Sequence, residues 1–229
     1  MRSKGNLLRF TLATLCILLG VSLGARGAEQ AASKPASEPV QAIWKDQELA
    51  FYFQSQTTFY SCSSLEAKLE RILKALGAHA RVKVRSVDCT SGMRIPRMPR
   101  VIVTMSSPVE ATPEALADRD KNKSTRELAA RVRGEKEDPA ALAPFPAQWQ
   151  RVTLSRGKVN LEPGDCELIE ELRRKVLPRL AVRLVKDNTH CTPHQVTIGQ
   201  PQLEVDALMA LPKPDEAQKA DEEKPAEPK

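Results

Sequence analysis

Cysteine is the residue type in this chain with the clearest capacity for chemistry. The sequence contains five cysteines, and Cys62 and Cys166 each stand where an apolar helical pattern begins. A cysteine in the first turn of a helix lies at the positive end of the helix dipole, which favours the reactive thiolate. Thiol oxidoreductases commonly place a second cysteine close by, as in Cys-x-x-Cys, but "SSLE" follows Cys62 and "ELIE" follows Cys166. The sequence therefore argues against redox catalysis at these helix starts.

The spacing of the cysteines favours two structural disulfides instead. Cys62 and Cys89 are 27 residues apart, and Cys166 and Cys191 are 25 residues apart. The fifth cysteine, Cys16, lies in the segment 1–27 and is expected to be removed with it. The other four can pair in three ways, and the similar spacing predicts Cys62–Cys89 with Cys166–Cys191. The pairing of Cys62 with Cys166 and of Cys89 with Cys191 is the alternative. A bridge that closes a loop of this length stabilises a fold by about 3–4 kcal/mol in the chain-entropy model.

A second candidate for chemistry is the stretch "THCTPH" (189–194), which brings His190 and His194 close to Cys191. Imidazole and thiolate are ligands of transition metals, so a copper or zinc site is the alternative hypothesis here. A cysteine held in a disulfide cannot ligate a metal as a thiolate, and only one further histidine, His79, occurs in the chain. We therefore expect exposed loop residues, with no metal and no cofactor.

The usual signatures of hydrolases and nucleotide-binding enzymes are missing from the sequence. It contains neither a Gly-x-Ser-x-Gly elbow nor a His-Glu-x-x-His motif, and no glycine-rich phosphate loop occurs among its 10 glycines. No catalytic residue can be assigned, and a protein that is not an enzyme is favoured. Whether it is an enzyme stays open at this stage.

The N-terminal segment 1–27 has the pattern of a cleavable export signal. A basic start precedes the apolar run "FTLATLCILLGV" (10–21), and small residues follow it. Removing this segment takes four of the 35 basic residues and none of the 29 acidic ones, so the net charge falls from +6 to +2. Binding to nucleic acid is therefore not expected. We expect a periplasmic or secreted protein without stable membrane insertion after cleavage.

Three segments outside the expected folded units are polar or rich in proline. Residues 28–41 are mostly small or polar, with prolines and no aromatic residue, and residues 213–229 mix charges of both signs with proline and alanine, so both are expected to be disordered. Residues 109–146 are expected to form a polar helical linker. Its helix-start signals are Thr112-Pro113-Glu114 and the capping box "STRE" (124–127).

The remaining chain contains an internal repeat, with units at 42–108 and 147–212. Trp44 lies 18 residues before Cys62, and Trp149 lies 17 residues before Cys166. Apolar residues and a glutamate recur at equal offsets after each helix-start cysteine. We interpret the pattern as a tandem duplication.

Each unit is expected to be a β-α-β-β element of an α+β protein, held by one disulfide. The helices at 63–77 and 167–180 each carry one apolar stripe, Gly77 suits the end of the first, and Pro178 limits the second. The units could form two small domains or share one sheet, and the sequence favours neither. The strands are expected at 48–55, 80–87, 99–106, 148–155, 180–187 and 201–209.

Six short motifs carry a resemblance to a known group of proteins: "YSC", "KALGA" and "VKVR" in the first unit, and "FPAQW", "GDCEL" and "VLP" in the second. Over about 40–211 the chain resembles an uncharacterised family of small exported proteobacterial proteins. The resemblance implies a place in the bacterial envelope and no activity. We therefore expect a non-enzymatic binding or interaction module whose partner is an unknown envelope protein or small ligand. The alternative is a metal- or redox-handling protein that uses residues 190–194. The oligomeric state is not indicated.

Overall fold

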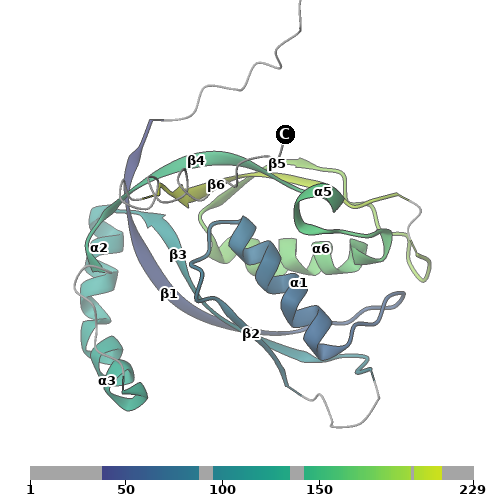
Figure 1. Cartoon of the computed structure of the whole chain (residues 1–229), viewed down its shortest axis with the longest axis horizontal. Coiled ribbons are helices and arrows are strands. Elements are labelled where there is room, and N and C mark those ends of the chain that lie inside the picture. Colours follow the sequence, from purple (N-terminus) through teal and green to yellow (C-terminus); the bar gives the residue numbers. More distant parts are fainter. Residues whose placement is uncertain (1–37, 88–94, 135–141, 197–198, 213–229) are drawn as a thin grey trace, which may run out of the picture. The chain divides into compact units, whose positions relative to one another are not determined.

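Six strands in the described part of the chain form one antiparallel sheet, in the order β2-β3-β1-β4-β6-β5 (Figure 1). The structure, a computed structural model of the whole chain, describes residues 38–87, 95–134, 142–196 and 199–212. The predicted signal, the tail 213–229, most of the linker 28–41 and Cys89 lie outside the described residues. The chain therefore has the expected α+β architecture, and of the two arrangements left open by the sequence it has the shared sheet.

The two halves of the chain contribute their elements in the same order. The first half runs β1 (Val40–Tyr52), α1 (Cys62–Ala75), β2 (Lys83–Val87) and β3 (Arg100–Glu110). The second half runs β4 (Phe145–Leu154), α5 (Arg156–Val159), η1 (Pro163–Asp165), α6 (Cys166–Glu171), η2 (Leu172–Val176), η3 (Leu177–Arg179), β5 (Val182–Asp187) and β6 (Leu203–Ala210). In each half the last strand lies between the other two, so β2 and β5 form the edges of the sheet.

The halves meet at a short seam between β1 and β4. Only three pairs are formed there, Val40↔Ala147, Gln41↔Pro146 and Ala42↔Phe145. With an offset of 105 between the halves, Val40 corresponds to Phe145 and Ala147 to Ala42, so the first pair corresponds to the third, and the same offset relates Gln41 to Pro146. The register is therefore symmetric about the central pair, and Trp44 and Trp149 differ in number by the same 105.

The first strand is longer than the sequence indicated. It begins at Val40, within the segment expected to be a linker, whereas the strand was predicted from residue 48. Ala42 is fully buried at the seam, and Ile43 is buried beside it. Pairing with β4, which comes from the other half of the chain, extends the strand toward the N-terminus. The pattern of neighbouring residues does not indicate this pairing, so it could not predict where the strand begins.

Helix α1 begins one residue before the predicted range 63–77 and ends two residues before its end. The hydroxyl of Ser61 accepts a hydrogen bond from Ser64 N at 3.2 Å and caps the first turn. Gly77 has φ +90°, a conformation that favours glycine, and it follows the last turn. The predicted apolar stripe is buried in full: Leu65, Leu69, Ile72, Leu73 and Leu76.

The helix predicted over 167–180 is not continuous. It is α-helical as α6, widens into one π-helical turn as η2 and closes as the 3-10 turn η3. Pro178 has no N–H to donate to the carbonyl of Arg174 four residues earlier, and its ring crowds that carbonyl, so the α-helical pattern cannot run through it. The predicted stripe is nevertheless buried: Leu168, Ile169, Leu172, Val176 and Leu177.

Both helices pack on one side of the curved sheet, between its two halves (Figure 1). One large hydrophobic core joins the buried faces of α1 and α6 to side chains from both halves of the sheet, and a second, small cluster of Ala42, Ala147 and Leu208 lies beside the seam. Each fully buried leucine or isoleucine contributes about 1.5–3 kcal/mol relative to an exposed one. The two halves are therefore stabilised by the same core.

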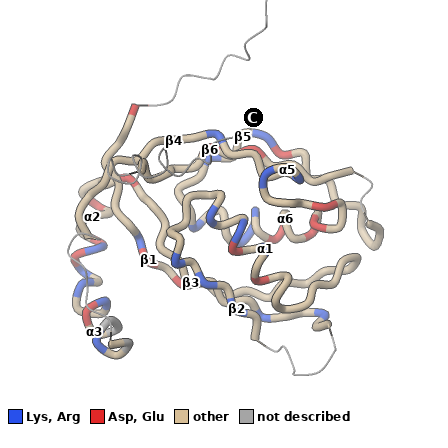
Figure 2. The backbone as a smooth tube through the Cα atoms, viewed as in Figure 1, with Lys and Arg blue, Asp and Glu red and all other residues tan. Residues whose placement is uncertain are grey.

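The segment between the halves forms the expected pair of polar helices, α2 (Pro113–Lys121) and α3 (Lys123–Arg133), with charges of both signs (Figure 2). Thr112 caps α2 as predicted, with its hydroxyl accepting from Ala115 N at 3.2 Å. The capping box placed at Ser124 is wrong, because α3 already begins at Lys123. No described helix is long and apolar enough to cross a membrane.

Candidate functional site

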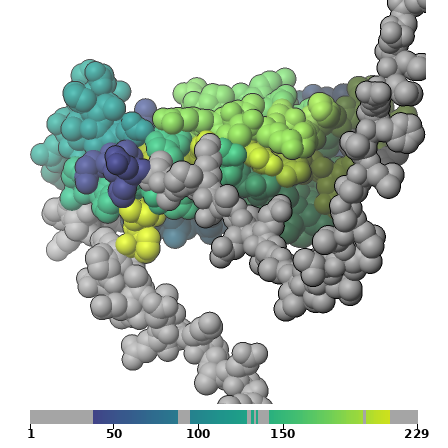
Figure 3. Space-filling model, turned by 90° about the horizontal axis from the view of Figure 1, so that it is seen from above, coloured from purple at the N-terminus to yellow at the C-terminus, as the bar shows by residue number. Residues whose placement is uncertain are grey.

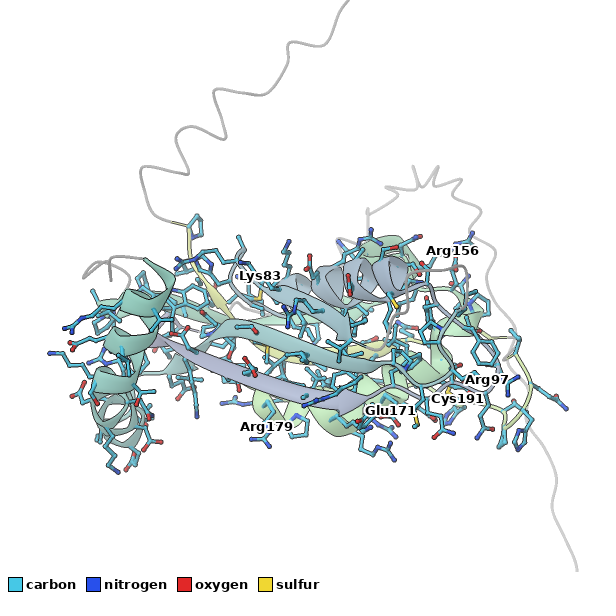
Figure 4. The ribbon with its side chains drawn as sticks, turned by 90° about the horizontal axis from the view of Figure 1, so that it is seen from below. Lys83, Arg97, Arg156, Glu171, Arg179 and Cys191 are labelled. Atoms are coloured by element: carbon cyan, nitrogen blue, oxygen red, sulfur yellow. A yellow bond between two sulfur atoms is a disulfide. The ribbon has the colours of Figure 1, made fainter. Side chains whose placement is uncertain are left out.

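The two helix starts that carry cysteines lie at the same end of the molecule, surrounded by three loops that we call the loop end: residues 53–61, 95–99 and 188–196. The first two loops are joined by a hydrogen bond from Phe53 N to Pro99 O at 3.0 Å. Figure 4 shows Arg97 and Cys191, from the second and third loops, at this same end. The candidate chemistry of the sequence is therefore gathered in one region.

Cys166 and Cys191 form a disulfide, with Cα atoms 5.5 Å apart, as the repeat predicted. It ties the start of α6 to the loop that follows β5. The cross pairing of Cys62 with Cys166 is therefore wrong. The predicted partner of Cys62, Cys89, lies outside the described residues, and that pairing stays a prediction.

A buried ion pair, which sequence reasoning missed, joins the two helix starts. Asp165, just before Cys166, has a side chain only 1% exposed. Lys68 on α1 donates to its two carboxylate oxygens at 2.6 and 2.8 Å, and its own side chain is 12% exposed. Glu162 N donates to the same carboxylate at 2.7 Å, and Tyr60 Oη donates to it as well. Three segments thus converge on one carboxylate.

The electrostatics of this cluster suit a structural contact better than proton transfer. Burial raises the pKa of Tyr60 far above its usual range, and the hydrogen bond to Asp165 and the negative charge there raise it further. A tyrosine with such a pKa stays protonated, and its hydroxyl donates to the Asp165 carboxylate. The Asp165 carboxylate has partners on both oxygens and is closed to solvent.

A second carboxylate, Glu167, fixes the loop after β1. It accepts hydrogen bonds from Gln56 N at 2.9 Å and Thr57 N at 3.3 Å, and from the hydroxyls of Ser55 and Thr57. Ser55 is buried, and its hydroxyl accepts from Thr58 N at 3.0 Å. A glutamate of α6 therefore orders a loop that belongs to the other half of the chain.

Close packing adds to this contact. A side chain at Gly164 would place its Cβ only 2.5 Å from the hydroxyl oxygen of Thr58. Only glycine fits where the loop after β1 meets the approach to α6. The sequence contained one signal of the junction, since an aspartate and a glutamate flank Cys166, but acidic residues are common at any helix start.

The histidines of the sequence do not come together. His190 and His194 are exposed, and Cys191 between them is in the disulfide. His79 lies elsewhere, edge-on to Trp44 with the ring centroids 5.0 Å apart. Burial and the charge of Arg81 lower its pKa, although Asp46 opposes the shift. Within the described ranges, no three histidine, cysteine, aspartate or glutamate side chains are grouped so that they could hold a metal ion.

The loop end carries an unusual share of exposed apolar surface. The described residues include nine large hydrophobic side chains that are exposed, and five of them lie in these loops or next to them. They are Tyr52, Phe59, Ile95, Met98 and Val196. Arg97 and Arg100 are exposed beside them. Such a grouping is typical of an interaction surface.

Comparison with known proteins finds no match: no family model fits the chain, and neither a curated protein nor a solved structure is detectably similar to it.

Proposed function

We propose that this protein is an exported, disulfide-stabilised interaction module of the bacterial envelope, without enzymatic activity, and that its loop end binds a partner protein. One observation carries the proposal. Cys166 is committed to a disulfide and Asp165 to a buried ion pair, while exposed apolar side chains gather on the loops that those contacts hold in place.

The contacts beneath the loop end have the features of a rigid support. Cys191 anchors the third loop through its disulfide, and Glu167 anchors the first loop through four hydrogen bonds. Asp165 and Lys68 join the helices from which both loops are held. A loop ordered before binding loses less conformational entropy when a partner binds, and this favours affinity.

The tandem duplication belongs to the same proposal. The symmetric seam of β1 and β4 and the equal element order of the halves support descent from one β-α-β-β unit. The motifs "VQAIW" (40–44) and "FPAQW" (145–149) occupy corresponding places at the seam. On this interpretation the loop end is built from the same region of both units, and its two sides diverged in sequence.

Site-specific photo-crosslinking in the periplasm tests the proposal. A photoreactive phenylalanine analogue placed at Phe59 or Met98 should yield a crosslinked partner band, since both side chains are exposed at the loop end. Thr104, exposed in the middle of β3, and Val132 on α3 are the matched control positions. Equal crosslinking at the controls, or none at the loop end, would contradict the assignment of this surface. Accumulation of the chain with its segment 1–27 intact in the cytoplasm would contradict export.

The metal-handling alternative keeps only His190 and His194 as ligands once Cys191 is bridged. Calorimetric titration with copper and zinc separates the two hypotheses. We expect no more heat from the unaltered chain than from a His190→Ala/His194→Ala variant. Tight binding that the variant loses would favour the alternative.

A further inference from the structure

The two edges of the sheet, β2 and β5, occupy corresponding places but differ in how they are protected. An edge strand presents backbone groups that can pair with another chain, and proteins usually cover or disrupt such edges. On β2 the covering is done by α1. Glu66 accepts from Ser86 N at 2.5 Å and Glu70 accepts from Val84 N at 3.2 Å. Two backbone donors of β2 are therefore closed by carboxylates.

Among the described residues, no helix side chain covers the second edge in this way. Glu170 and Arg174 stand at the same offsets from Cys166 as Glu66 and Glu70 do from Cys62. Arg174 instead pairs with Glu171, and Glu170 accepts no hydrogen bond from a described group of β5. No other described side chain bonds to the backbone of this strand. Figure 3 looks onto this half of the molecule, coloured green to yellow-green.

The side chains of β5 confirm that its outer edge is uncovered. Leu184 is 55% exposed and Val185 is 42% exposed. Leu184 stands opposite Val205 of β6, whose side chain is fully buried, so Leu184 belongs to the core-facing side of the sheet. No described strand pairs with its outer flank. A further strand placed there would cover Leu184 in the way that β6 covers its inner flank.

We propose that β5 accepts an added strand from a partner protein, an extended segment in which apolar and acidic residues alternate. The pattern follows from β6, the strand that already pairs with β5. In β6 Leu203, Val205 and Ala207 are buried, while Glu204 and Asp206 point to the other face, opposite Lys186 and Arg183 of β5. An added strand of this kind gives Leu184 an apolar neighbour and Lys186 an acidic one.

The basic side chains of β5 favour an acidic partner segment over a second copy of the chain. Lys186 is exposed and forms no ion pair with a described residue, while the guanidinium of Arg183 leans across β6, 3.9 Å from the ring of Trp149. Pairing β5 with itself brings basic strands together. An acidic segment supplies the missing complement.

The test uses peptides whose sequences come from the chain itself. The probe is the β6 sequence "QLEVDAL" (202–208), and its charge-reversed control is "QLKVKAL". Both are titrated into the chain from Ala28 onward, which includes the compact unit Pro35–Lys229. Amide exchange and chemical shifts are followed residue by residue. We expect the probe to protect β5 amides and the control to bind about tenfold more weakly, from the change of cross-strand charge pairs.

Variants make the result specific. Lys186→Glu should reverse the preference, so that the control peptide binds better than the probe. Lys83→Glu, an equally exposed position on the closed edge β2, should change neither. Protection that appears on β2, shifts confined to the loop end, or no response of β5 at millimolar peptide would overturn the proposal. So would a dimer joined through β5 in the absence of peptide. These outcomes leave the loop end, and the crosslinking at Phe59 and Met98, unaffected.

Discussion

At the scale of single residues, the Lys68–Asp165 pair is the contact whose disruption should most lower the free energy of unfolding. Both side chains are nearly closed to solvent, and a buried charge deprived of its partner is strongly unfavourable. We expect Lys68→Met to lower the free energy of unfolding by about 3–5 kcal/mol, measured by urea denaturation. The double variant Lys68→Met/Asp165→Asn should recover part of the loss, because the amide carries no charge. A cost below about 1 kcal/mol for Lys68→Met, the value of an exposed pair, would contradict this account.

His79 gives the molecule a dependence on pH at one residue. Its pKa is lowered in the folded chain by burial and by Arg81, so the unfolded chain binds a proton more readily. Stability is therefore fully present above the ordinary histidine pKa of about 6.5 and falls as the pH drops through it toward the folded value. The imidazole is partly exposed, so we expect a change below about 1 kcal/mol. His79→Asn should flatten a thermal-melting profile between pH 5 and pH 7 (roughly the range in which histidine titrates), whereas His194→Asn, at an exposed position, should not.

At the scale of elements, the end of α1 depends on a glycine for two reasons. Gly77 has a positive φ, and a Cβ there would lie 2.6 Å from the carbonyl oxygen of Leu208 on β6. Gly77→Ala therefore combines backbone strain with a clash against the neighbouring half. We expect a loss of about 2–4 kcal/mol in unfolding free energy, as for other strained or overpacked sites. Gly157→Ala is the matched control, because nothing lies within 4 Å of its Cβ position. Equal changes in unfolding free energy for the two variants would show that the close approach to β6 does not matter for stability.

The elements that could be predicted from sequence are those fixed by neighbouring residues. Helix α1 was predicted within two residues, because Ser61, the apolar stripe and Gly77 all lie within one stretch of chain. The turn η2 could not be predicted in the same way, since Pro178 determines where the α-helix fails but not which wider turn replaces it. Nor was α5 predicted, because its four residues carry no apolar period.

In the candidate site too, contacts within one half of the chain could be predicted and contacts between the halves could not. The disulfide of Cys166 with Cys191 followed from a spacing that is repeated in the chain. The ion pair of Lys68 with Asp165 joins residues 97 positions apart, and neither side chain breaks the pattern of a solvated helix. A lysine on a helix and an aspartate at a helix start are ordinary surface residues until the fold brings them together. Contacts between the halves were therefore the part that sequence could not supply.

At the scale of the whole molecule, the symmetric seam and the shared core make one cooperative unit from two halves. β1 and β4 pair over three residues only, so the seam alone would hold the halves weakly. The halves are held together mainly by the large hydrophobic core and by carboxylates of the second half that bind the first. Neither half can lose its structure without exposing buried side chains of the other.

The two tryptophans allow this cooperativity to be measured, because Trp44 lies in the first half and Trp149 in the second. Trp44 stacks on Phe145 across the seam, and Trp149 donates to Glu110 at 2.8 Å. We expect the fluorescence of the single-tryptophan variants Trp149→Phe and Trp44→Phe to change with urea at the same midpoint as the circular dichroism of the same variant. Each variant is thus its own control for any loss of stability caused by the substitution. Coincident transitions are the mark of two-state unfolding. A fluorescence midpoint separate from that of the backbone signal would mean that one half unfolds while the other persists, which a single shared core does not allow.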